Sequence, residues 1–142
     1  MSKSVLNKTY DNSPKVKQIV DSLQQADLKI QLNGLIGSSL SFVVRSLFKK
    51  TEKPFLLILN DKEEAAYYLN DLEQMLGQND VLFYPSSYRR PYQIEETDNA
   101  NILLRSEVLN RINSRKKPSI IVTYPEALFE KVVTKKELDK NT

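Results

Sequence analysis

The sequence of 142 residues contains neither cysteine nor histidine. Without cysteine the chain has no disulfides, no thiolate metal ligands and no cysteine nucleophile. Without histidine it lacks the commonest general base and the commonest metal ligand, and serine–histidine triads are excluded. Much of the usual catalytic repertoire is therefore missing.

Long apolar runs are also missing. No stretch approaches the ~20 apolar residues that a membrane span requires, and the first residues have no apolar core of signal-peptide length. We expect a cytoplasmic protein without membrane contact. Apolar residues make up 40% and charged residues 27% of the chain, with a formal net charge of +3, which are ordinary values for one globular domain. The mild basic excess is only a weak indication of nucleic-acid binding.

Glycine is scarce, and two of the three glycines lie close together in the stretch 28–41. Leu28, Ile30 and Leu32 alternate with polar residues, which predicts a short strand. The two glycines follow as a turn, and helix-forming residues come next. Strand, glycine turn and helix in this order give the outline of a phosphate-binding loop.

The chemistry of such a loop is absent. The pattern G-x-x-x-x-G-K-[ST] needs glycines for close backbone approach, a lysine for the phosphates and a hydroxyl for magnesium. On this pattern Leu40 replaces the lysine and Ser39 the second glycine. We predict an inactive, degenerate loop and expect no catalytic residue, metal or cofactor in this chain. The loop comprises Gly34, Gly37, Ser38, Ser39, Leu40 and Ser41.

The remaining pattern alternates helices and strands. Apolar periodicity and capping residues predict helices over 14–25, from Asp61 to Gly77, from Asp98 or Asn99 onward, and over 125–129. Continuous apolar runs predict strands over 55–59, 81–84 and 118–123. With the strand before the glycine turn, this order predicts an α/β domain with a mainly parallel sheet and helices on both faces.

In such a sheet, ligands bind at the carboxyl ends of the strands. The Gly34 loop, Asn60–Asp61, the Pro85 loop and Tyr124 should all lie at that edge. The Pro85 loop carries Arg89 and Arg90 among tyrosines, a mixture that can stack bases and meet phosphates. We expect a solvated surface loop, and nucleic-acid contact through these residues is the alternative.

Three motifs in sequence order resemble the UvrB-like domains of bacterial excision repair, and within that group the transcription-repair coupling factors. The first is the glycine turn Asn33–Ser38. The second is Val81–Pro85 followed by Arg90-Pro91-Tyr92. The third is the helix that ends at 111–115, followed by Ile120–Leu128. The interval 85–97 is too short for the long tyrosine-rich hairpin of UvrB, which favours the coupling factors.

The resemblance implies a P-loop NTPase-like, UvrB/helicase-like three-layer domain that has lost ATP hydrolysis. It implies a non-catalytic scaffold for recruitment of UvrA, mainly through the next domain. It also implies that RNA polymerase and double-stranded DNA are partners of later domains, which would make the full-length protein an ATP-dependent translocase.

The resemblance also suggests how the chain is divided. We expect a flexible N-terminus over 1–12, the UvrB-like domain over 13–130, and the truncated start of an inserted domain over 131–142. Two alternatives stay open. One is a nucleotide-binding domain with weak residual ATP binding, and the other is a DNA-binding module that uses Arg89 and Arg90.

Overall fold

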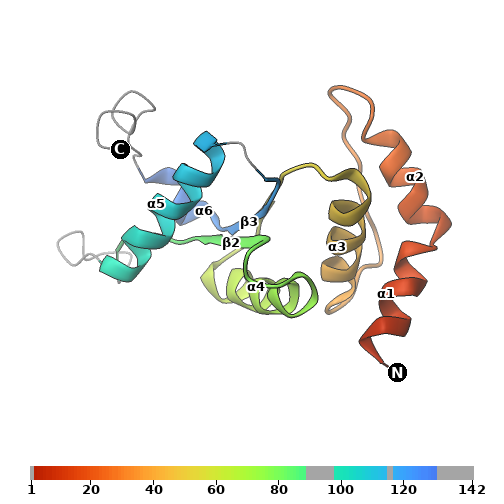
Figure 1. The fold of residues 1–142 in the computed structure, drawn as a ribbon, viewed down its shortest axis with the longest axis horizontal. Coiled ribbons are helices and arrows are strands. Elements are labelled where there is room, and N and C mark those ends of the chain that lie inside the picture. Colours follow the sequence, from red (N-terminus) through yellow and green to blue (C-terminus); the bar gives the residue numbers. More distant parts are fainter. Residues whose placement is uncertain (1, 89–97, 115–116, 131–142) are drawn as a thin grey trace.

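The computed structural model describes residues 2–88, 98–114 and 117–130. In this part the chain forms, in order, α1 (Lys3–Asp11), α2 (Pro14–Ser22), α3 (Ser39–Thr51), β1 (Phe55–Ile58), α4 (Lys62–Leu76), β2 (Val81–Tyr84), α5 (Asn99–Ser114), β3 (Ile120–Thr123) and α6 (Pro125–Phe129). The helices and strands alternate from α3 onward, as the sequence predicts (Figure 1).

The three described strands form one parallel sheet in the order β1-β3-β2. Ile120 of the central strand lies opposite Phe55 on one side and Val81 on the other. All four residues of β3 are buried, because α4 covers one face of the sheet and α5 the other (Figure 1). The predicted three-layer α/β fold with a parallel sheet is therefore confirmed.

The predicted helix starts are also confirmed. The Asp61 carboxylate accepts a hydrogen bond from the Glu64 N–H at 2.8 Å, and the Glu64 carboxylate accepts one from the Asn60 N–H at 2.9 Å. This reciprocal pair is a complete capping box at the start of α4. At the start of α5, Asp98 accepts from the Ala100 N–H at 2.9 Å. Local sequence determines where α4 and α5 begin, because these capping hydrogen bonds join residues at most four positions apart.

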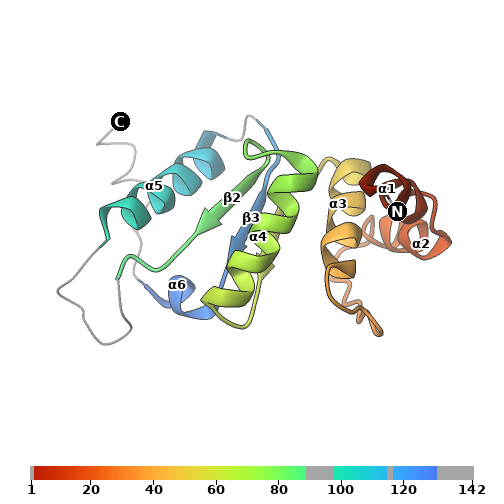
Figure 2. The same cartoon turned by 90° about the horizontal axis from the view of Figure 1, so that it is seen from below.

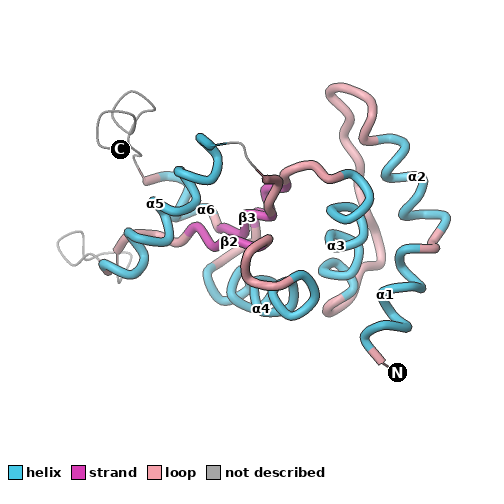
Figure 3. The backbone as a smooth tube through the Cα atoms, viewed as in Figure 1, coloured by secondary structure: helices cyan, strands magenta, loops and turns pink. Residues whose placement is uncertain are grey.

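The strand predicted over Leu28–Leu32 is wrong. Residues 24–38 form neither helix nor strand, and this open segment runs back along α3 (Figure 3). No backbone–backbone hydrogen bond joins residues 26–35 to any other described residue. The alternating pattern is that of a strand, but a strand also needs a neighbour for its N–H and C=O groups. The described part of the sheet therefore has three strands and not four.

Within the N-terminus that we expect to be flexible, residues 3–11 form α1. The Tyr10 ring stacks on Phe42 of α3 with centroids 5.1 Å apart. The Asp11 carboxylate accepts from the Arg45 guanidinium at 3.0 Å and from the Ser46 hydroxyl at 2.7 Å. These contacts come from a helix some thirty residues later, so local composition does not reveal them.

The apolar residues gather in two clusters on either side of α3. Val44 and Phe48 of α3 belong to the main core, which includes the sheet and α4. Val43 and Leu47 face the other way and join Val16 of α2 in a smaller cluster. Figure 2 shows α1, α2 and α3 as a group of helices beside the sheet. Helix α3 is thus the element shared between the two clusters.

Candidate functional site

The glycine turn has the backbone geometry that its glycines allow. Gly34 has a φ of +79° and Gly37 a φ of +55°, values that glycine adopts without a steric penalty. Helix α3 begins two residues after Gly37, at Ser39. The turn-to-helix half of the predicted motif is therefore present, while the strand before it is missing.

The hydroxyl groups of the turn are bonded within the protein. The Ser39 hydroxyl accepts from the Ile36 N–H and donates to the Ile36 carbonyl, both at 2.7 Å. Ser41, at the magnesium-ligand position of the pattern, is fully buried and donates to the Asp71 carboxylate of α4 at 3.2 Å. In this arrangement neither hydroxyl is directed at a ligand.

Leu40, at the lysine position, is partly buried and packs against the main core. The first turn of α3 therefore directs this side chain toward the protein interior. The Ser38 hydroxyl is bonded to the Tyr67 hydroxyl at 2.8 Å, and the Gly37 carbonyl accepts from the Tyr68 hydroxyl at 3.4 Å. Gly37 and Ser38 are thus both hydrogen-bonded to α4.

The loop after β2 lies against the end of β3, as the strand-edge prediction requires. The Ser86 N–H donates to the Tyr124 hydroxyl at 2.8 Å, and the Ser86 carbonyl accepts from the Asn101 amide at 2.9 Å. The structure thus joins the Pro85 loop and Tyr124, whereas the glycine turn is held separately against α4. Arg89 and Arg90 lie outside the described residues.

A buried ion pair organises this edge. Arg105 of α5 lies 3.5 Å from the Glu130 carboxylate, and the two side chains are 8% and 13% exposed. The same guanidinium donates to the Pro85 and Ala127 carbonyls at 2.8 and 3.0 Å and covers the Tyr84 ring at 4.2 Å. It therefore ties the ends of β2 and α6 to α5.

Glu130 completes the network from the other side. Its carboxylate accepts from the Ser86 hydroxyl, from the Ser87 N–H at 2.9 Å and from the Ser87 hydroxyl at 2.6 Å. Burial alone would raise the pKa of Glu130, but these hydrogen bonds and the Arg105 charge outweigh it, so its pKa lies below the usual range. The carboxylate is therefore ionised at neutral pH.

Burial is the largest influence on the pKa values of the neighbouring tyrosines. It raises the pKa of Tyr84 and of Tyr124 above the ordinary value. Both hydroxyls are therefore neutral at physiological pH, and Tyr124 serves as a hydrogen-bond acceptor for Ser86.

Sequence reasoning missed Arg105 and Glu130. One signal was available for Arg105: it shares its spacing with Val108, Leu109 and Ile112, so an arginine stands in an apolar stripe of α5. An arginine at such a position needs a buried partner. No comparable signal marks Glu130, because its hydrogen-bond donors lie more than forty residues earlier.

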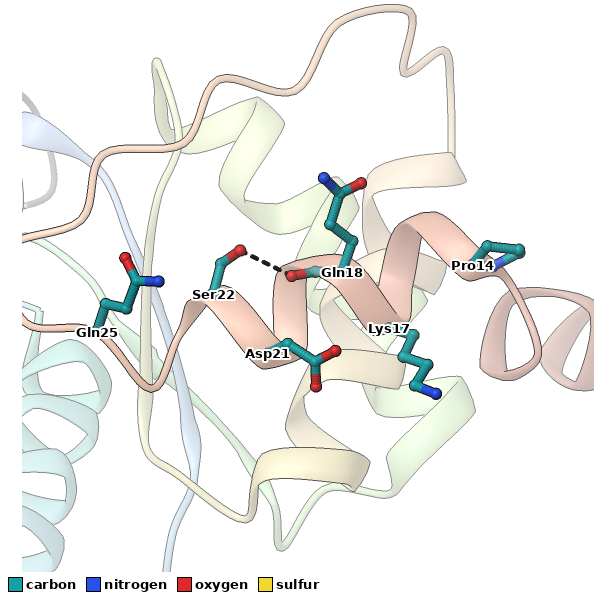
Figure 4. Close-up of a pocket in the computed structure, with 6 residues that line it drawn as sticks. All are labelled: Pro14, Lys17, Gln18, Asp21, Ser22 and Gln25. Carbon is teal, nitrogen blue, oxygen red and sulfur yellow. Dashed lines mark hydrogen bonds between the residues drawn. The ribbon is translucent and has the colours of Figure 1, made fainter.

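Three other features of the described chain bear on possible binding sites. A hollow of about 340 Å³ along α2 is lined by Pro14, Lys17, Gln18, Asp21, Ser22 and Gln25 (Figure 4). No group of three or more carboxylates gathers where it could hold a metal within residues 2–88, 98–114 and 117–130. Over the same residues, no helix is long and apolar enough to cross a membrane.

Comparison with known proteins links this fold to DNA repair. The transcription-repair-coupling factor of Bacillus subtilis is 28% identical over 126 residues, which are 89% of this chain and 10% of that protein. The chain is similar to the UvrB-like domain of a transcription-repair coupling factor. UvrABC system protein B of Thermodesulfovibrio yellowstonii is 30% identical over 78 residues, 55% of this chain and 12% of that protein.

The chain spans only about a tenth of the length of these two relatives. UvrABC system protein B of Mycoplasma mobile is 23% identical over 138 residues, which cover 89% of this chain and 21% of that protein. No family model and no solved structure matches the chain.

Proposed function

We propose that the chain is a non-catalytic module of a transcription-repair coupling factor and a scaffold for UvrA recruitment in transcription-coupled nucleotide excision repair. The match to a coupling factor extends over 89% of the chain, while the UvrB match of higher identity extends over 55%. The observation that carries the non-catalytic part is Leu40, which packs on the main core where a phosphate loop would present its lysine.

Other domains would supply the activities of the full-length protein. We propose that these domains bind RNA polymerase and translocate on double-stranded DNA at the expense of ATP, thereby displacing stalled polymerase. UvrA would be contacted mainly by the domain that follows residues 13–130. The present domain would then hold that neighbour in place without hydrolysing nucleotide or holding a cofactor.

One observation favours a second candidate, a UvrB- or helicase-type domain with weak residual ATP binding. Gly34 and Gly37 keep positive φ values, and a Cβ at either position would meet no atom within 4 Å. The space beside the turn is therefore open to a ligand. A DNA-binding module using Arg89 and Arg90 is a further alternative that rests on sequence alone.

The first test measures saturable binding of a fluorescent ATP analogue. We expect none for the natural chain, and none for the double variant Ser39→Gly and Leu40→Lys. Because Leu40 contacts the core, the new lysine should also lower the free energy of unfolding by about 1–3 kcal/mol. Leu35→Lys places a lysine on an exposed part of the same turn and serves as the matched control. Saturable binding by the natural chain would refute the non-catalytic assignment.

The second test is capture of purified UvrA by this chain and by a longer version that includes the following domain. We expect efficient capture by the longer version only. Equal capture by the short chain would place the UvrA contact on the present domain instead.

A further inference from the structure

Five aliphatic side chains are exposed within nine residues of the open segment between α2 and α3. Leu28, Ile30, Leu32 and Leu35 are 37–42% exposed, and Ile36 is 84% exposed. Single exposed aliphatic residues are normal on protein surfaces, but a contiguous row of them marks an interaction site.

Part of this row borders a groove. A hollow of about 450 Å³ lies between α2 and residues 30–35, and Val16, Ile19 and Val43 contribute to its apolar lining together with Ile30, Leu32 and Leu35. Val16 and Val43 are almost completely buried and form part of the smaller core cluster. The groove is thus built on a packed helical support, with the open segment as one wall.

The backbone of that wall has no partner. Residues 26–35 make no backbone–backbone hydrogen bond within the described chain, and side chains of alternate residues are apolar over 28–32. A row of free N–H and C=O groups with period-two aliphatic side chains is the surface to which an incoming extended peptide adds as a β-strand. The form of the backbone therefore favours a strand over a helix as the occupant.

The charge of the groove indicates which charge a bound segment should carry. Lys15 is the one charged residue among those that line the groove in the described chain. An occupant with a carboxylate near Lys15 would complement it, while a cationic one would be repelled.

A second copy of this chain fits poorly. Its own segment over 28–35 carries Lys29 and no acidic residue.

We propose that residues 28–35 and α2 form a docking groove for an extended segment of another protein. The segment adds as a β-strand to residues 28–33, places alternate aliphatic side chains in the groove, and presents an acidic residue to Lys15. This site is additional to the proposed scaffold function and does not depend on it.

The test uses the whole chain labelled with ¹⁵N and a short peptide of alternating valine and glutamate as the probe. We expect saturable chemical-shift changes in residues 28–35 and about tenfold slower amide exchange there. A peptide of alternating valine and lysine should bind about tenfold more weakly. Lys15→Glu should reverse that preference.

Matched variants distinguish binding in the groove from non-specific hydrophobic binding of the peptide. Ile30→Asp should abolish the peptide-induced shifts, whereas Ile36→Asp, at a more exposed aliphatic residue outside the lining, should leave them unchanged. Equal loss in both variants would overturn the proposal. So would an absence of shifts in residues 28–35, or a peptide-free dimer in sedimentation with slow exchange in that segment.

Discussion

Arg105 and Glu130 show how two charged side chains can be accommodated at a sheet edge. Burying either one alone would be costly, and each is instead surrounded by partners. The guanidinium meets two carbonyls and a tyrosine ring, and the carboxylate meets two serines. The result is a junction that holds β2, α5 and α6 together.

The Glu130 network predicts a specific pH dependence of stability. Because the pKa of Glu130 is lowered in the folded chain, its ionised form stabilises the fold above the ordinary glutamate pKa of about 4.3. That contribution should be lost as pH falls through the lower pKa of the folded state. Glu130→Gln should cost about 1–3 kcal/mol at pH 7 and flatten the decline in acid. Urea unfolding across this pH range measures both effects.

Glu126→Gln is the matched control, since this glutamate lies in α6, four residues before Glu130, and is exposed. It should leave the acid dependence as it is in the natural chain. If Glu130→Gln behaved the same way, the carboxylate would contribute nothing as an anion.

At the scale of elements, the end of α3 combines a favourable and an unfavourable feature. Lys49 and Lys50 stand in the last turn of α3, where cations interact favourably with the helix dipole. The residue after that turn is Glu52, and it adopts the left-handed conformation with a φ of +50°. Glycine is the usual residue at this position, because a Cβ is unfavourable there.

Replacing Glu52 with glycine should therefore stabilise the chain. We expect the free energy of unfolding to rise by about 0.5–1 kcal/mol, because the strain of the left-handed residue is relieved. Lys50→Gly, within the last turn of the same helix, should instead lower it by up to about 1 kcal/mol. Thermal unfolding of both variants distinguishes the two positions, and destabilisation by Glu52→Gly would contradict the strain argument.

At the scale of the molecule, α1 and α2 complete a second small core on the outer side of α3. Tyr10 stacks on Phe42, and Val16 packs with Val43 and Leu47. Without these helices the outer side of α3 would face water with its apolar residues exposed. The N-terminal helices are therefore part of the folded domain and not a separate tail.

Deleting residues 2–12 tests this directly. The deletion exposes Phe42 and removes the Asp11 partner of Arg45, so we expect a loss of at least about 2 kcal/mol in stability and increased binding of a hydrophobic dye. Val5→Ser, at an exposed position of α1, should change little. Unchanged stability after the deletion would show that α1 contributes nothing to the fold.

Several structural features of this protein are determined by short stretches of its sequence. The capping box of Asp61 and Glu64, the end of α4 at Gly77 and the strands over 55–58, 81–84 and 120–123 depend on neighbouring residues and on apolar runs. That Leu40 stands at the lysine position of the phosphate-loop pattern can also be read from the sequence alone. These features could be predicted because their causes lie within a few residues.

Only the tertiary structure decided the rest. Residues 28–32 have the pattern of a strand yet form none, because pairing needs a neighbouring backbone that the pattern does not supply. Residues 3–11 have a weak pattern yet form a helix, because Phe42, Arg45 and Ser46 hold its end. Arg105 and Glu130 become partners because the sheet brings the ends of β2 and α6 together. In each case the deciding contact joins residues that are far apart in the sequence.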